Sequence, residues 1–138
     1  MEIREIKSEN ELKSVLELCY SILPDTENSI IYGYKSWVER LSGGLQPMIY
    51  AVEDDKIVAA VLGRAENEDS MIIGLVACDK NYRRRGITKK LMLQFEKMSR
   101  KMNYKYITLG SKEDAFYDSC GYKIICKMHG QNIYQKIL

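Results

Sequence analysis

The sequence predicts an α/β domain of the α+β type, in which about four helices flank a mixed, mainly antiparallel sheet of six to seven strands. Its composition is that of a folded globular protein, because 46% of the 138 residues are hydrophobic and 29% are charged. Hydrophobic spacing switches between the periods of strands and helices, giving the order βααβββαβαββ. The length fits one domain, which we expect over residues 1–138.

The N-terminal part predicts a short strand and a capped helix. The strand covers residues 3–7, and the next four residues, Ser8-Glu9-Asn10-Glu11, have the Ser-x-x-Glu form of a capping box. Apolar residues then recur at helical spacing as far as Ile22, and Pro24 ends the helix.

A second helix and a hairpin follow. The helix carries apolar residues on one face over residues 30–41, and the glycine pair at 43–44 stops it. Strands at 48–53 and 57–64 flank the segment 54–56, Asp-Asp-Lys, which is a hairpin signal.

The second half of the chain changes period several times. Residues 71–78 are apolar almost throughout, as expected of a strand covered on both faces. A helix follows, and its apolar stripe consists of Ile87, Leu91, Phe95, Met98 and Met102. The remaining elements are a strand, a short helix and two closing strands, at residues 104–109, 112–119, 122–128 and 132–138.

Several features of the sequence favour the cytoplasm. The longest apolar stretches, such as Met71 to Cys78, are far shorter than the roughly 18–20 residues of a membrane helix. The N-terminus lacks the basic start and apolar core of a secretion signal. Cysteines stand at positions 19, 78, 120 and 126 without a Cys-x-x-Cys pair, and three of them sit in apolar runs, where buried reduced thiols are common. We therefore expect a cytoplasmic protein with no membrane partner.

The single histidine, His129, argues against two common kinds of site. A zinc site would need an irregular ligand set, so no metal is expected. A Ser-His-Asp hydrolase would need His129 as its base, and no nucleophile motif accompanies it.

Residues 80–90 concentrate the positive charge of the chain. Six of these eleven residues are basic and none is acidic, whereas the rest of the chain has 15 basic and 19 acidic residues. The cluster opens the helix at Ile87, where unpaired N–H groups and the helix dipole favour an anion such as phosphate. Gly86 lets the backbone approach that anion. From charge alone, a phosphate-binding site and a solvated basic loop are equally good interpretations of this segment.

Two motifs resolve this choice. The segment from Arg83 to Thr88 resembles the Arg/Gln-x-x-Gly-x-Gly/Ala signature of the GNAT superfamily of acyl-CoA N-acyltransferases. The segment from Ala115 to Tyr122 is similar to the family's Phe-Tyr-x-x-x-Gly-Phe segment, and the order of elements matches along nearly the whole length. Thr88 departs from the family's usual Gly or Ala, so its branched Cβ must point away from the ligand.

The resemblance implies acetyl-CoA as co-substrate. In this family the sheet splays after the fourth strand, the pantetheine arm lies in the gap, and the helix N-terminus holds the pyrophosphate. A backbone N–H at Val76 would polarise the thioester carbonyl. The cofactor-binding residues implied are Val76, Ala77, Cys78, Arg83, Arg84, Arg85, Gly86, Ile87, Thr88 and Lys89.

The resemblance also implies direct attack by an amine on the thioester, with Tyr117 at the general-acid position beside the leaving sulfur. The reference pKa of tyrosine, about 10, exceeds that of a thiol, about 8.5, which favours a hydrogen bond over full proton transfer. The alternative is that Tyr117 only packs beside Phe116. No residue is assigned as general base, because the segment from Met71 to Gly74 has no carboxylate. Cys78 and Cys120 have no partner histidine within their motifs, so buried packing is favoured over an acyl-cysteine.

The leading hypothesis is therefore an N-acetyltransferase that moves an acetyl group from acetyl-CoA to a primary amine of a small molecule or peptide. The alternative is a non-catalytic acyl-CoA-binding regulatory domain. A nucleic-acid partner is not expected, because it needs an extended positive surface rather than one cluster. The acidic remainder of the chain hints at a cationic acceptor such as a polyamine, aminoglycoside or peptide amine. Tyr32, Tyr34, Trp37 and Tyr50 fall on the family's acceptor side, with core packing an alternative for Trp37, and the family often pairs its closing strands in homodimers.

Overall fold

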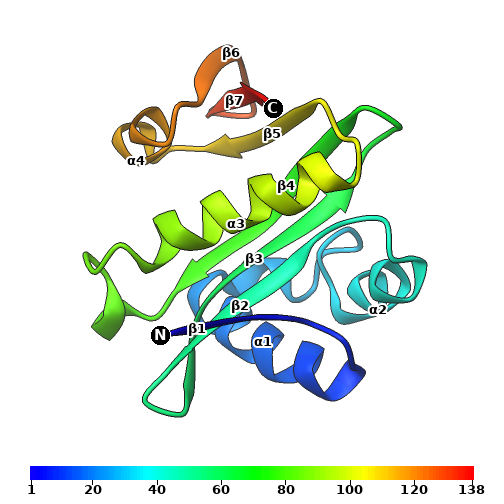
Figure 1. Cartoon of the computed structure of the whole chain (residues 1–138), viewed down its shortest axis with the longest axis vertical. Coiled ribbons are helices and arrows are strands. Elements are labelled where there is room, and N and C mark those ends of the chain that lie inside the picture. Colours follow the sequence, from blue (N-terminus) through cyan, green and yellow to red (C-terminus); the bar gives the residue numbers. More distant parts are fainter.

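The computed structural model describes residues 1–138 and contains seven strands and four α-helices in the predicted order (Figure 1). In chain order these are β1 (Glu2–Glu5), α1 (Glu9–Ile22), α2 (Tyr34–Gly43), β2 (Met48–Glu53), β3 (Lys56–Ala65), β4 (Ser70–Cys78), α3 (Ile87–Lys101), β5 (Tyr106–Ser111), α4 (Asp114–Ser119), β6 (Lys123–Met128) and β7 (Gln131–Ile137). Two 3-10 turns, Pro24–Thr26 and Lys80–Tyr82, follow α1 and β4.

The strands form one sheet in the order β1-β2-β3-β4-β5-β7-β6. Every neighbouring pair is antiparallel except β4 and β5, which run parallel. This is the mixed, mainly antiparallel sheet that the sequence predicts.

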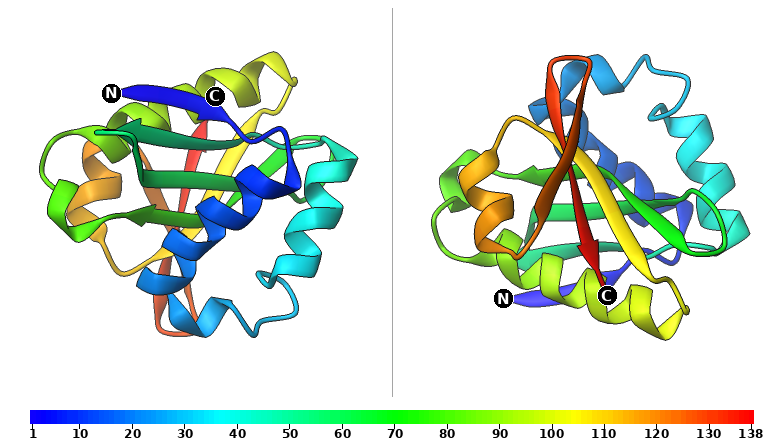
Figure 2. Two further views of the ribbon diagram at one scale, coloured as in Figure 1. Left: turned by 90° about the horizontal axis from the view of Figure 1, so that it is seen from below. Right: turned by 90° about the horizontal axis from the view of Figure 1, so that it is seen from above.

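Helices cover the two faces of the sheet and create two cores. On one face α1 and α2 bury Leu16 and Trp37 against alternate residues of β2, β3 and β4. On the other face α3 buries Leu91 and Phe95 against the remaining residues of these strands. Figure 2 shows α3 and α1 on opposite sides of the strands. The sheet is therefore covered on both faces, as the apolar sequence of residues 71–78 predicts.

Local signals fix the start of α1. Ser8 is its N-cap, and its hydroxyl accepts the Glu11 N–H at 3.1 Å, while the Glu11 carboxylate accepts the Lys7 N–H at 3.3 Å. This confirms the Ser8 half of the predicted capping box, whereas the Glu11 carboxylate accepts the N–H of Lys7 in place of the N–H of Ser8.

The start of the second helix was predicted too early. α2 begins at Tyr34 rather than at residue 30, and the Ile30 side chain is 91% exposed. Side chains hold the preceding turn, because the Tyr20 hydroxyl and the Trp37 Nε1–H both donate to the Tyr32 carbonyl, at 2.7 Å and 3.0 Å. These tertiary bonds, and not the local pattern, set the helix start.

The predicted stripe of α3 is also wrong toward its C-terminal end. Met98 is only half-buried and Met102 lies exposed beyond the helix, whereas Glu96 and Ser99 are buried. β6 is exposed along its whole length, so Cys126 is exposed although it follows two isoleucines.

All four cysteines are unpaired. None of the helices has both the length and the apolar character that crossing a membrane requires.

Candidate active site

The sheet opens between its two parallel strands. β4 and β5 pair only where Ser70, Met71 and Ile72 face residues 106–108. β4 then continues to Cys78 without a partner on this side. Figure 1 shows β4 and β5 diverging from their shared end. The backbone groups on this edge of β4, over residues 73–78, therefore pair with no other strand of the chain.

A β-bulge lies where the strands part. Leu62 of β3 pairs with Leu75. The next residue, Gly63, pairs with Ile73, so Gly74 is an extra residue on β4. Such a bulge bends its strand and increases the local twist. It was not predicted, although a glycine inside an apolar strand is a known signal for one.

Two aromatic rings pack directly on this bulge. A Cβ atom at Gly74 would lie 2.8 Å from Tyr32 Cε1 and 3.0 Å from Trp37 Cη2. The Tyr32 and Trp37 rings are stacked, with centroids 6.0 Å apart and an interplanar angle of 22°. The close approach of these rings requires glycine at position 74.

Backbone hydrogen bonds decide which way the peptide groups of β4 point beyond the bulge. The Asp79 N–H donates to the Val58 carbonyl of β3 at 2.7 Å. Because peptide groups alternate along a strand, Ala77 also faces β3, whereas Val76 and Cys78 present their N–H groups to the open edge. The structure thus separates the predicted residue Ala77 from Val76 and Cys78, since only the latter two offer donors to the gap.

The connection from β4 to α3 presents a row of free backbone donors. None of the N–H groups of residues 83–89 donates to another group of the chain, and the first bond of α3 runs from the Lys90 N–H to the Gly86 carbonyl at 3.1 Å. Arg84 and Gly86 have left-handed φ angles of 63° and 75°. Left-handed residues in such a turn direct successive N–H groups into an anion-binding concavity, and the dipole of α3 adds to it. Ile87 contributes only its N–H, because its side chain is buried in the core.

Contacts on the preceding 3-10 turn hold this loop in place. Asp79 accepts the Asn81 N–H at 2.9 Å and forms an ion pair with Lys56 at 3.0 Å, and these two contacts lower the pKa of Asp79. The Tyr82 hydroxyl donates to Asp54 at 3.1 Å across the loop. The hairpin between β2 and β3 therefore braces the base of the loop.

The arginines of the loop keep their charges unpaired. Arg83 Nε donates to the Cys78 carbonyl at 3.4 Å, and the Arg85 guanidinium stacks 4.8 Å from the centre of the Tyr82 ring. No carboxylate forms an ion pair with Arg83, Arg84 or Arg85, and all three are exposed. A guanidinium without a carboxylate partner remains available to an external phosphate.

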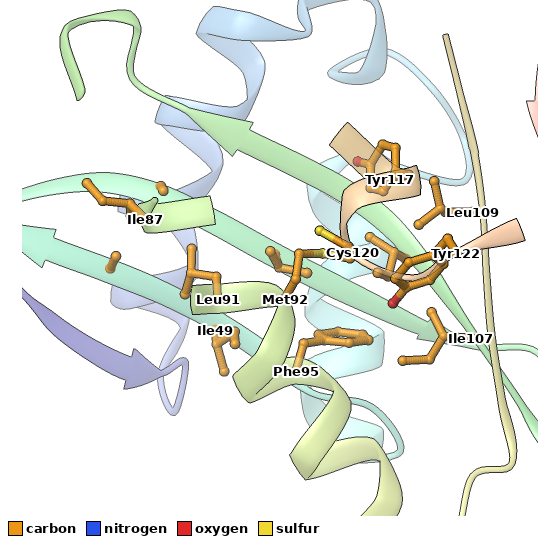
Figure 3. Packing of buried hydrophobic residues seen from close by; sticks show 14 of the residues in the cluster. Ile49, Ile87, Leu91, Met92, Phe95, Ile107, Leu109, Tyr117, Cys120 and Tyr122 are labelled. Carbon is orange, nitrogen blue, oxygen red and sulfur yellow. The ribbon is translucent and has the colours of Figure 1, made fainter. Parts of the chain in front are cut away.

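Tyr117 lies on α4, which follows β5. Its side chain is 6% exposed and packs edge-to-face against Phe116 at 5.0 Å between ring centroids. The hydroxyl donates to no group of the chain, and in Figure 3 it points away from Leu109 and Tyr122. Burial raises the pKa of Tyr117 well above its ordinary range, so the hydroxyl stays protonated at neutral pH. The ring is thus packed while the proton remains available as a hydrogen-bond donor.

Cys120 has no histidine partner that would serve as its base. Burial raises the pKa of Cys120, and His129 lies in the turn between β6 and β7 with a left-handed φ of 53°. No three His, Cys, Asp or Glu side chains gather as metal ligands.

The fold is shared with solved acetyltransferases over nearly the whole chain. PaiA N-acetyltransferase from Thermoplasma acidophilum, in complex with coenzyme A, matches with a TM-score of 0.81 at 18% identity, covering 100% of both chains. An aminoglycoside 6'-N-acetyltransferase complexed with coenzyme A gives 0.81 at 16% identity over 99% of this chain and 97% of that chain. A GNAT-family acetyltransferase from Staphylococcus aureus Mu50 gives 0.82 at 18% identity over 99% and 98%.

Sequence comparison leads to the same family. No curated protein matches the chain. The family model described as acetyltransferase (GNAT) family matches residues 10–122, which is most of the sequence and includes both the loop at Gly86 and Tyr117. The chain therefore belongs to the GNAT family of acetyltransferases.

Proposed function

We propose that this chain transfers an acetyl group from acetyl-CoA to a primary amine of a small molecule or peptide. The observation that carries the proposal is the continuous row of unused N–H groups at residues 83–89, next to the free edge of β4. Such a row suits a diphosphate, and a free strand edge suits the amide-containing arm of a coenzyme A thioester. The complexes of two structural neighbours with coenzyme A support this cofactor.

In the proposed complex the loop holds the diphosphate and β4 holds the arm. The N–H groups of Arg84, Gly86 and Thr88 donate to phosphate oxygens, with the guanidinium groups of Arg83 and Arg85 adding charge-assisted bonds. The Val76 N–H, which faces the gap, donates to the thioester carbonyl. This bond strengthens as the carbonyl oxygen becomes negative in the transition state.

The chemistry is a direct acyl transfer. The amine nitrogen forms a bond to the carbonyl carbon, the carbon–sulfur bond breaks, the amine proton passes to solvent and the coenzyme leaves as thiolate. Tyr117 donates a hydrogen bond to that sulfur. Full proton transfer would be uphill by about 2 kcal/mol from reference pKa values alone, and burial, which raises the pKa of Tyr117, increases the gap further.

The alternative is a regulatory domain that binds acyl-CoA without turnover. The Tyr117 hydroxyl favours an enzyme, because it lies at the end of a buried ring, donates to no group of the chain and is itself not buried, so it remains available to a ligand. Turnover of any amine with release of free thiol separates the two hypotheses.

A thermal-shift screen tests the cofactor. Acetyl-CoA at 100 times its Kd should stabilise the protein by about 2.7 kcal/mol and raise the unfolding midpoint by several degrees, while ATP should not. The Arg83→Ala/Arg85→Ala variant should lose most of that rise, and Arg100→Ala on the exposed face of α3 should keep it. An unchanged coenzyme affinity in the double variant would overturn the loop assignment.

We also propose that residues 1–138 form a single N-acetyltransferase domain and that β6 supports a homodimer. β6 is an edge strand whose Ile124, Ile125 and Met128 are each 52% exposed. Edge strands of this kind pair with a second chain unless they are protected. Light scattering after size exclusion is expected to give twice the monomer mass, and a monomer at all concentrations would contradict it.

A further inference from the structure

Two arginines without counter-charges lie together on the face of the sheet that α1 and α2 cover. Arg40 comes from α2 and Arg64 from the end of β3. Their guanidinium carbons lie 5.9 Å and 5.8 Å from the centre of the Tyr32 ring, and Arg40 also stacks on Trp37 at 4.5 Å. Neither arginine takes part in any ion pair of the structure. Both guanidinium groups therefore lie against the same aromatic ring, that of Tyr32.

A buried glutamine holds the backbone segments that carry the two arginines close to each other. The side chain of Gln46 donates from Nε2 to the Arg40 carbonyl at 2.7 Å, and its Oε1 accepts the Ala65 N–H at 3.4 Å. Gln46 is 9% exposed, so the two bonds form inside the protein. They tie the backbone of Arg40 to the residue that follows Arg64.

The donors of this arginine pair are largely unused. Arg64 Nε is buried and donates to no group, and the only side-chain hydrogen bond of Arg40 runs from Nη1 to the Ile31 carbonyl at 2.6 Å. Burial and the charge of Arg64 lower the pKa of Arg40. A carboxylate or phosphate would relieve the repulsion and satisfy the planar donor forks.

The pair lies near the closed end of the gap where acetyl transfer is proposed, at the level where β4 still pairs with β5. The Tyr32 ring covers Gly74, and Arg64 pairs with Ile72, two residues before Gly74 on β4. Val76 is two residues beyond Gly74, which is roughly 7 Å along a strand. The arginines are therefore on the order of 10 Å from the proposed acetyl position, the length of a small molecule.

We infer that Arg40 and Arg64 bind an anionic group, a carboxylate or a phosphate, of the acceptor whose primary amine attacks the acetyl group. The inference rests on the proposed function. It departs from the cationic acceptor suggested by the acidic remainder of the chain outside residues 80–90, because an acceptor meets the charges near the gap and not the average over the surface.

Matched amines test this assignment by kinetics. One pair is ε-aminocaproate and its amide, and the other is aminopentyl phosphate and aminopentanol. The native enzyme should have a KM at least about 10-fold lower for the anionic member of at least one pair, as charge-assisted hydrogen bonds provide. The pair with the larger preference tells whether a carboxylate or a phosphate is recognised.

Variants locate that preference. Arg40→Gln and Arg64→Gln should each reduce it below about 3-fold while leaving the KM for acetyl-CoA unchanged. The exposed Arg100→Gln, the matched control, should retain it. Equal use of charged and neutral amines by the native enzyme, or a preference that survives both variants, would overturn the arginine site while leaving acetyl transfer established.

A binding measurement decides the site even when no amine is turned over. Inorganic phosphate and acetate are titrated separately into the Arg83→Ala/Arg85→Ala variant, in which the loop at Gly86 keeps only the guanidinium group of Arg84, against chloride at equal ionic strength. The unfolding midpoint should rise with at least one of the two anions, and adding Arg64→Gln should abolish that rise. Should Arg64→Gln not fold, Arg64→Lys keeps the charge without the planar fork and should reduce the rise. A rise that is absent from the first variant with both anions, or that persists in full when Arg64 is replaced, would refute the site.

Discussion

Tyr117 combines a packed ring with a hydroxyl that donates to nothing in the chain, and its replacement by phenylalanine isolates that hydroxyl. We expect Tyr117→Phe to lower kcat about 10- to 100-fold, with an unchanged Kd for coenzyme A, because the lost bond forms only as charge develops on sulfur. Since burial raises the pKa of Tyr117, the hydroxyl keeps its proton as the pH rises, so its ionisation should cause no loss of kcat between pH 7 and about 10. Thiol release and calorimetry measure the two quantities. Tyr106→Phe, on the paired part of β5, is the control, and equal kcat values in both variants would leave Tyr117 only a packing role.

A single-residue substitution at Gly74 tests the packing of the aromatic rings on the β-bulge. Gly74→Ala places a methyl group 2.8 Å from Tyr32 Cε1, and this overpacking should lower the free energy of unfolding by about 1–3 kcal/mol. Gly43→Ala, where nothing lies within 4 Å, should be neutral or slightly stabilising. Urea unfolding measures both. Combining Gly74→Ala with Tyr32→Ala should cost less than the sum of the two changes, and strict additivity would show that the ring and the new methyl group do not meet.

At the scale of elements, a buried ion pair joins α3 to β7. Glu96 is 2% exposed, and its carboxylate accepts bonds from Lys136 Nζ at 2.9 Å and from the Tyr122 hydroxyl at 3.0 Å. Lys136→Met would leave a buried carboxylate without its cation, so we expect a loss of about 3–5 kcal/mol in unfolding free energy. Lys105→Met removes the exposed pair with Asp69, at 3.5 Å, and should cost under about 1 kcal/mol. If both variants lost a similarly small amount of unfolding free energy, burial of the Glu96 carboxylate would not require the charge of Lys136.

The order and type of every element could be predicted from the sequence because their signals are local. The Ser8 cap depends on residues close to it in the sequence, and hydrophobic spacing identifies each strand and helix. The loop around Gly86 was predictable for the same reason, since one short segment carries both the charge and the helix start.

What could not be predicted depends on contacts between distant segments. The start of α2 is set by bonds to the Tyr32 carbonyl from Tyr20 and Trp37. Glu96 is polar in the sequence yet buried, because Lys136, distant in the chain, supplies its counter-charge. The pairing of Arg40 with Arg64 likewise depends on Gln46, which connects two elements, and no local pattern signals it.

At the scale of the whole molecule, the sheet consists of two parts with a short shared seam. β5, β7 and β6 are linked to β1–β4 by only three paired positions between β4 and β5, supplemented by contacts with α3. We expect amide exchange in residues 106–128 to be faster than in β2 and β3, because fewer contacts resist local opening. Coenzyme A that binds the gap should slow this exchange, which deuterium-exchange mass spectrometry would detect. Equal protection of the two parts without ligand would show that the seam does not limit their stability.

The extra residue on β4 also determines how this strand can be redesigned. Met71 and Ile73 belong to the core beneath α3, whereas Leu75 and Ala77 belong to the core beneath α1, because Gly74 shifts the alternation by one place. Excising position 74 would straighten the strand and keep each of these side chains on its present face. Excising any residue between 75 and 77 would instead turn every later side chain of the strand to the wrong core.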